Sequence, residues 1–126
     1  MEKYIYEGNS KTPTINFDLE SGSLEIKGRS VPENSIEFYR PLIEAIDKYS
    51  ASAKPNTNVN IFLEYFNTSS SKCILDVFKK LEKIHNSGNT VTIHWKYEQE
   101  DDDMLEAGQD YQALVNVPFK MVGVAE

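Results

Sequence analysis

The chain has 126 residues, a formal net charge of −7 and one cysteine. That length suits a single domain over residues 1–126 that buries roughly two-thirds of its unfolded surface, and the negative charge argues against nucleic acid as a partner. One cysteine cannot form an internal disulfide and no secretory leader opens the chain, so we expect a reducing, cytoplasmic location without membrane insertion.

The first predicted elements are strands. A short apolar and aromatic segment at residues 4–6 fits an edge strand. Residues 14–18 and 24–27 each alternate between apolar and polar side chains, and the segment between them, 20–23, has the composition of a turn. This pattern predicts a β-hairpin over residues 14–27.

A helix follows, and Pro41 complicates its start. Asn34 and Glu37 resemble a capping box, and apolar residues recur at helical spacing from residue 36 to residue 49. Pro41 would lose a hydrogen bond inside a helix. Either a short turn spans residues 35–39 and the main helix begins near Pro41, or one helix kinks there; we prefer the first interpretation.

The centre of the chain predicts a strand that leads directly into a helix. Residues 58–66 alternate, with Leu63 and Tyr65 on one face and Phe62 and Phe66 on the other, which fits a central strand that is apolar on both faces. Apolar residues then recur every three or four positions to Ile84, which predicts a helix within residues 69–87.

The junction between that strand and that helix is rich in side chains that can cap a helix. Lys72 would lie in the first helical turn, where an acidic residue is preferred, and a capping box starting at Ser69 would also favour Glu or Gln at this position. Hydroxyls, free backbone amides and a lysine suit an anion, either a ligand or a phosphate carried by a hydroxyl. Ordinary capping with a solvated lysine is the competing interpretation. The junction consists of Asn67, Thr68, Ser69, Ser70, Ser71 and Lys72.

The last third predicts a strand at 90–97, an acidic loop at 98–103 and a weaker helix over Met104–Val115, in which Gly108 lowers helix propensity. Residues 118–124 fit either a tail strand or extended packing. The order β-β-β-α-β-α-β-α predicts an α/β fold, with a small mixed β-sheet and helices mainly on one face.

No sequence motif points to catalysis. The chain has no Walker-type phosphate loop, dinucleotide-binding glycine motif, nucleophile elbow or Cys-x-x-Cys pair, and neither histidine has a partner at metal-ligand spacing. We therefore expect no metal and no cofactor. An enzyme that uses Thr68 or a neighbouring serine as a nucleophile is the least favoured alternative.

Three stretches carry a family resemblance. They are Gly28-x-Ser30-x-Pro32-Glu-Asn34 with Phe38-Tyr39-x-Pro41, then Tyr65-Phe-Asn-Thr-Ser-Ser-Ser-Lys72, and Trp95-x-Tyr97 followed by Asp102-Asp-Met104-x-Glu106-x-Gly108-x-Asp110-Tyr111. Together they resemble the SiaC family of bacterial regulatory phosphoproteins, over nearly the whole chain.

The resemblance implies a fold similar to STAS domains and a role as a partner switch. A cognate kinase would phosphorylate Thr68 and a PP2C-like phosphatase would remove the phosphate. The unphosphorylated form would bind and activate an effector such as a diguanylate cyclase, and so raise cyclic di-GMP. The other junction residues, Asn67, Ser69, Ser70, Ser71 and Lys72, would surround the phosphorylated side chain.

A second candidate surface lies in the acidic stretch. A charged rim beside apolar side chains is common at protein interfaces, so we expect a partner surface at Asp101, Asp102, Asp103, Met104 and Leu105. The chain is expected to be monomeric alone. The alternative function is a STAS-like module that binds a small anion or nucleotide at the start of the helix after Thr68.

Overall fold

The computed structural model describes residues 3–125. Its six strands form one sheet whose spatial order follows the chain, β1 to β6. The elements are β1 (Lys3–Tyr6), β2 (Thr14–Asp18), β3 (Ser23–Ser30), α1 (Ser35–Ser50), β4 (Asn56–Phe66), α2 (Thr68–Asn86), β5 (Thr90–Glu98), α3 (Asp102–Leu114) and β6 (Phe119–Val124).

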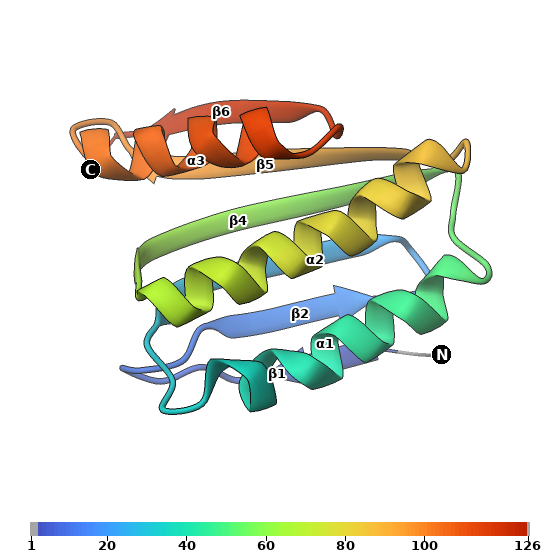
Figure 1. Cartoon of the computed structure of the whole chain (residues 1–126), viewed down its shortest axis with the longest axis horizontal. Coiled ribbons are helices and arrows are strands. Elements are labelled where there is room, and N and C mark those ends of the chain that lie inside the picture. The colour runs from blue at the N-terminus through green and yellow to red at the C-terminus, as the bar shows by residue number, and fades with distance from the viewer. Residues whose placement is uncertain (1–2, 126) are drawn as a thin grey trace.

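The connections explain why the helices share one face. β1, β2 and β3 pair antiparallel, whereas β3, β4, β5 and β6 pair parallel. Each parallel step needs a crossover, and because crossovers are right-handed and all steps run in the same direction, every helix falls on the same side. Figure 1 shows α1, α2 and α3 in front of the sheet, which confirms the predicted mixed α/β architecture.

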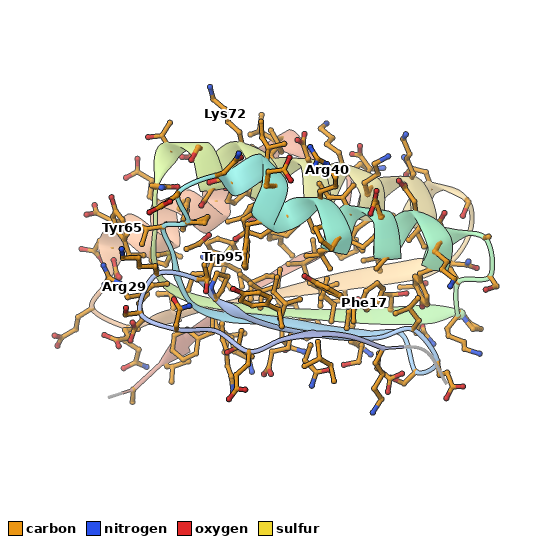
Figure 2. The ribbon with its side chains drawn as sticks, turned by 90° about the horizontal axis from the view of Figure 1, so that it is seen from below. Phe17, Arg29, Arg40, Tyr65, Lys72 and Trp95 are labelled. Atoms are coloured by element: carbon orange, nitrogen blue, oxygen red, sulfur yellow. The ribbon has the colours of Figure 1, made fainter. Side chains whose placement is uncertain are left out.

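The core lies between this helical layer and the sheet. Alternate residues of the strands are buried toward the helices, and Figure 2 shows Phe17 and Trp95 between the two layers. The apolar stripe of α2 packs onto them, as its spacing predicted. The opposite face of the sheet is open and mostly polar, so the prediction that β4 is apolar on both faces holds only at Phe62, which is half-buried.

An irregularity at the end of β4 reverses two predicted orientations. The pairing of β3 with β4 shifts register between Gly28, opposite Leu63, and Arg29, opposite Tyr65, so β4 contains an extra residue there. Phe66 consequently packs against Trp95, with ring centroids 6.3 Å apart. Tyr65, predicted to share a face with Leu63, is instead 50% exposed.

The preferred interpretation of Pro41 was wrong. α1 is one helix from Ser35 to Ser50, with Asn34 as its N-cap and Pro41 inside it. Pro41 is exposed, so the carbonyl of Glu37, which loses its usual helical donor, faces water and can be hydrated. The buried apolar stripe of α1 then outweighs the missing hydrogen bond.

The remaining elements largely agree with the sequence. The hairpin of β2 and β3 is confirmed, and the tail of the chain is a strand, β6, paired with β5. α3 begins at Asp102, two residues before the predicted start. None of the helices within residues 3–125 combines the length and apolar character needed to cross a membrane.

The topology brings three junctions together. Because β3, β4 and β5 are parallel, the connections from β3 to α1, β4 to α2 and β5 to α3 all leave from one edge of the sheet, which we call the carboxyl edge. In open α/β sheets this is the edge at which functional residues gather. Both predicted sites lie there.

Candidate functional site at the carboxyl edge

The start of α2 is set by Asn67. This residue has extended backbone angles (φ −84°, ψ 175°), and its side-chain oxygen accepts a hydrogen bond of 2.9 Å from the backbone N–H of Ser70. Asparagine is among the strongest N-caps. Thr68 is therefore the first helical residue and Lys72 the fifth, so Lys72 lies just beyond the first turn in which we predicted it, and no capping box starts at Ser69.

Ser70 belongs to a buried hydroxyl network. Its side chain is 0% exposed, and its Oγ donates a hydrogen bond of 3.0 Å to the carbonyl of Ser30 and accepts one of 2.8 Å from the Ser30 Oγ. The Oγ of Ser30 lies 2.6 Å from the hydroxyl of Tyr39, and that of Ser35 lies 3.3 Å from Ser70. Burial raises the pKa of Tyr39, which keeps its hydroxyl protonated in this network.

Ser69 and Ser71 fasten the same helical turn to the neighbouring helices. The Oγ of Ser69 lies 2.8 Å from the Oγ of Ser35 at the start of α1. The Oγ of Ser71 lies 3.1 Å from the hydroxyl of Tyr111 in α3, which also donates a hydrogen bond of 2.9 Å to the Ser71 carbonyl. Burial raises the pKa of Tyr111 to about 12, so this donor stays protonated at neutral pH.

Thr68 differs from the three serines after it. Its side chain is exposed at the first position of α2. Within residues 3–125 its hydroxyl takes part in no hydrogen bond, whereas Ser69, Ser70 and Ser71 each bond to another element. The first turn of α2 therefore contains three hydroxyls with structural roles and one that is available to an external group.

These roles lead to a stability prediction. Replacing Ser70 with alanine is expected to lower the free energy of unfolding by about 1–2 kcal/mol, because it removes two buried hydrogen bonds between Ser70 and Ser30. Thr68→Ala, the matched control in the same helical turn, is expected to change it by less than about 0.5 kcal/mol. Urea unfolding of both variants measures the difference. Equal losses would show that the network contributes no more than the exposed threonine.

Lys72 stands one turn after Thr68 on the same side of α2, because residues four apart are neighbours on a helix. Its side chain is exposed, and Figure 2 shows it projecting from the helix, away from the sheet. Side chains of a helix lean toward its N-terminus, so the Lys72 ammonium, together with the first backbone amides of α2, suits an anion placed at Thr68.

The acidic stretch at the start of α3 has a local structural role as well. Asp101 is the N-cap of α3, accepting a hydrogen bond of 3.0 Å from the backbone N–H of Met104. Asp102 and Asp103 belong to the first helical turn and not to a loop, and both are exposed where carboxylates favour the helix dipole.

The two apolar residues predicted for the partner surface differ in exposure. Met104 is only 7% exposed, and its backbone carbonyl accepts a hydrogen bond of 2.9 Å from the indole N–H of Trp95, so this residue belongs mainly to the core. Leu105 is half-buried. A partner at this surface would therefore meet chiefly the carboxylates and Leu105.

The two predicted sites are neighbours. A groove of about 280 Å³ separates the end of β4, just before Asn67, from the first turns of α3. We call it the acidic groove; it is lined by Glu64, Tyr65, Phe66, Asp101, Asp103, Met104 and Ala107. Among residues 3–125, the acidic, histidine and cysteine side chains form no group of three or more arranged to hold a metal ion.

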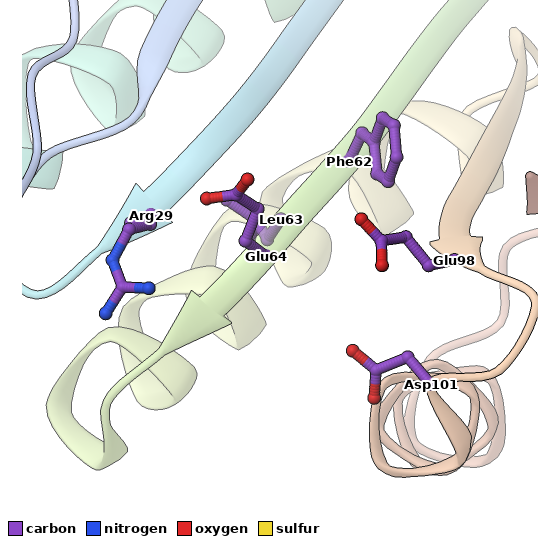
Figure 3. Close-up of a pocket in the computed structure, with 6 residues that line it drawn as sticks. All are labelled: Arg29, Phe62, Leu63, Glu64, Glu98 and Asp101. Carbon is purple, nitrogen blue, oxygen red and sulfur yellow. The ribbon is translucent and has the colours of Figure 1, made fainter. Parts of the chain in front are cut away.

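A second hollow of about 250 Å³ adjoins the acidic groove and shares Glu64 and Asp101 with it. Figure 3 shows Arg29, from the end of β3, on one side of this hollow, with Glu98 and Asp101 on the other. The guanidinium of Arg29 lies 5.6 Å from the ring centroid of Tyr65.

Sequence reasoning missed Arg29 and Tyr111 as site residues, although both lie within the resembling stretches or beside them. No local pattern marks Arg29, because the register shift that places it against Tyr65 depends on strand pairing. In the sequence, Tyr111 cannot be distinguished from the other apolar residues of the predicted helix. Only the contact between α2 and α3 reveals its hydrogen bonds to Ser71.

Comparison with known proteins shows which family this chain resembles. Residues 6–124 match the family model described as SiaC family regulatory phosphoprotein. An uncharacterized protein of Pseudomonas aeruginosa (strain UCBPP-PA14) is 30% identical over 112 residues, which cover 89% of this chain and 89% of that protein.

Solved structures agree with the sequence comparison. The crystal structure of apo-SiaC from Pseudomonas aeruginosa matches with a TM-score of 0.90 and 28% identity, over 98% of this chain and 100% of that chain. A chain in the crystal structure of the diguanylate cyclase SiaD in complex with its activator SiaC, from the same organism, matches with a TM-score of 0.89 and 28% identity, over 98% and 99% of the two chains.

Proposed function

The chain belongs to the SiaC family of regulatory phosphoproteins, and on that premise we propose that it is a switch controlled by phosphorylation of Thr68. Its unmodified form binds and activates a downstream effector, and a phosphate on Thr68 prevents that binding. The role is carried by protein contacts and needs no catalytic group of this chain.

The availability of the Thr68 hydroxyl is the observation that carries the proposal. A kinase must bring the γ-phosphate of ATP to the threonine oxygen, which attacks the phosphorus while ADP leaves. Thr68 is exposed and has no internal hydrogen bond to break within residues 3–125, whereas Ser70 is fully buried. Helix-capping arguments alone could not choose among the four hydroxyls; their burial and bonding favour the threonine.

Electrostatics explains how the modification would act. A phosphate adds about −1.5 to −2 charges at neutral pH, at a position where Lys72 and the N-terminus of α2 can hold it. A surface that docks without charge at Thr68 would then carry a localised anion. A partner with apolar or acidic groups over this position would reject it, since burying an unpaired charge is costly.

The family relatives suggest the partners. SiaC of Pseudomonas aeruginosa is the activator of the diguanylate cyclase SiaD. We infer that a diguanylate cyclase is likewise the effector of this chain, so that the unmodified protein raises cyclic di-GMP in the cytoplasm. A cognate kinase would add the phosphate and a PP2C-like phosphatase would remove it.

The acidic stretch belongs to the same proposal. Asp101, Asp102, Asp103 and the partly exposed Leu105 lie at the carboxyl edge that also bears Thr68. Because Tyr65 and Phe66 of the acidic groove directly precede Asn67 in the chain, an effector that covers Thr68 can also contact the start of α3. We therefore infer that both surfaces contact one partner.

The site of modification is directly testable. Incubation with the cognate kinase and ATP is expected to add one phosphate, and peptide mapping is expected to place it on Thr68. Intact-mass measurement of Thr68→Ala serves as the control and should show no addition. A phosphate on Ser69 or Ser71, or a phosphorylated alanine variant, would contradict the assignment and favour a module that binds a free anion at the start of α2.

A further inference from the structure

The acidic groove combines carboxylates with an apolar floor. Glu64 and Asp103 are exposed, Asp101 is half-buried, and all three side chains line the groove. The lining also includes the rings of Tyr65 and Phe66 and the methyl group of Ala107. A partner segment that fits this surface must therefore bring positive charge and apolar area together.

Arg29 shows which chemical group this surface accepts. Its guanidinium lies 5.6 Å from the ring centroid of Tyr65, within the range of a cation–π contact. It also lines the adjoining hollow together with Glu64 and Asp101. Figure 3 shows it on the β3 side of Glu64, whereas Asp101 and the start of α3 lie on the other side. The hollow that Glu64 and Asp101 line thus already contains one cation of this chain, the Arg29 guanidinium.

On the side of Glu64 and Asp101 that faces α3, the described residues supply no such cation. The residues that line the acidic groove include three carboxylates and no lysine or arginine. Tyr65 is 50% exposed even with Arg29 beside it, so much of its surface remains open to a partner. Carboxylates around an exposed aromatic ring are suited to arginine, which can pair with the acid and stack on the ring.

We propose that the acidic groove binds a segment of the effector that presents an arginine or lysine next to an apolar side chain. The inference rests on the proposed function and adds the chemistry of the partner. The cation would lie among Glu64, Asp101 and Asp103, and the apolar side chain would pack on Tyr65 and Ala107.

This assignment gives the acidic groove and the Thr68 position different roles in effector binding. Charge in the acidic groove attracts the cationic segment and raises the association rate, in a manner that salt screens. A phosphate on Thr68 would not repel that segment. Rejection of the phosphorylated form must therefore come from the part of the effector that lies directly over Thr68.

The test uses charge-neutralising variants that preserve shape. In the triple variant Glu64→Gln, Asp101→Asn and Asp103→Asn, the substituted side chain at position 101 can still cap α3, because asparagine and aspartate cap equally well. We expect about tenfold weaker binding to the cognate diguanylate cyclase, mainly through slower association, and a flatter dependence on salt.

A matched control and a mapping experiment complete the test. Glu7→Gln with Glu44→Gln removes exposed carboxylates elsewhere and is expected to change affinity by less than about twofold. A photo-crosslinking residue in place of Ala107 is expected to capture an effector peptide containing arginine or lysine, whereas one in place of the exposed Leu114 is not.

The outcomes separate the two proposals. If the cyclase binds but the triple variant binds as tightly as the wild type, or if the captured peptide is acidic or uncharged, the cationic segment is wrong and the Thr68 switch stands. If neither the unmodified protein nor Thr68→Ala binds the cyclase, the proposed function fails and this inference fails with it.

Discussion

A phosphate on Thr68 is expected to weaken binding to the cognate diguanylate cyclase by about 100-fold, which corresponds to about 2.8 kcal/mol. Like charges or an unpaired charge placed in an interface cost several kcal/mol, and Thr68 is exposed at the point where α2 leaves the sheet. Titration calorimetry of the kinase-treated and untreated proteins measures the change. Cyclase turnover of GTP, followed in parallel, should fall with it.

Variants separate the charge from the loss of the hydroxyl. Thr68→Ala should bind as tightly as the unmodified protein and resist the kinase. Thr68→Asp should bind about tenfold more weakly, because one carboxylate mimics only part of the phosphate charge. Thr90→Asp is the matched control: Thr90 is exposed at the start of β5, at the opposite end of the parallel strands. Equal binding by Thr68→Asp and Thr68→Ala would defeat the mechanism.

The structure also indicates why such a switch would not need to unfold anything. The turn that begins with Thr68 is fastened to β3, α1 and α3 by Ser70, Ser69 and Ser71. A phosphate at a helix N-terminus is favourable to the helix. Modification would therefore change the charge of a rigid surface, and the affinity of the effector would respond to that charge directly.

The parts of the fold that the sequence predicted are those decided by local periodicity. The alternation in β2, β3 and β4 and the apolar stripe of α2 each identify an element without knowledge of its neighbours. The prediction at Pro41 was wrong because helix propensity reflects only the lost hydrogen bond. Burial of one long apolar face decides whether α1 continues through Pro41.

The details of the site depend on pairings that no local pattern records. The extra residue in β4 turns Phe66 into the core and Tyr65 outward, and it arises from the register with β3. The different hydrogen-bonding roles of the four hydroxyls likewise depend on Ser35 and Tyr111, which lie about 35 and 40 residues away in the sequence. The sequence identified the junction, and tertiary packing separates Thr68 from its neighbours.

Gly108→Ala is expected to lower the free energy of unfolding by about 2 kcal/mol, although alanine is the better helix former by about 1 kcal/mol. A Cβ at this position would overlap Cδ1 of Trp95 and lie 2.6 Å from its Nε1. The indole is fully buried and donates to the carbonyl of Met104, so it cannot move aside without loss. Gln109→Ala, exposed on the same helix, is the control and should be neutral or stabilising.

A double-mutant cycle identifies the clash as the cause. Valine at position 95 lacks the Cδ1 and Nε1 atoms that lie nearest to the added methyl group, so Gly108→Ala should cost less in a Trp95→Val background. A coupling of about 1 kcal/mol or more is expected from thermal or urea unfolding of the four proteins. Because the Trp95 indole also bonds to the first turn of α3, Gly108→Ala should displace Asp101 and Asp103 and weaken effector binding. The same penalty in both backgrounds would instead assign the glycine a role in the backbone of α3.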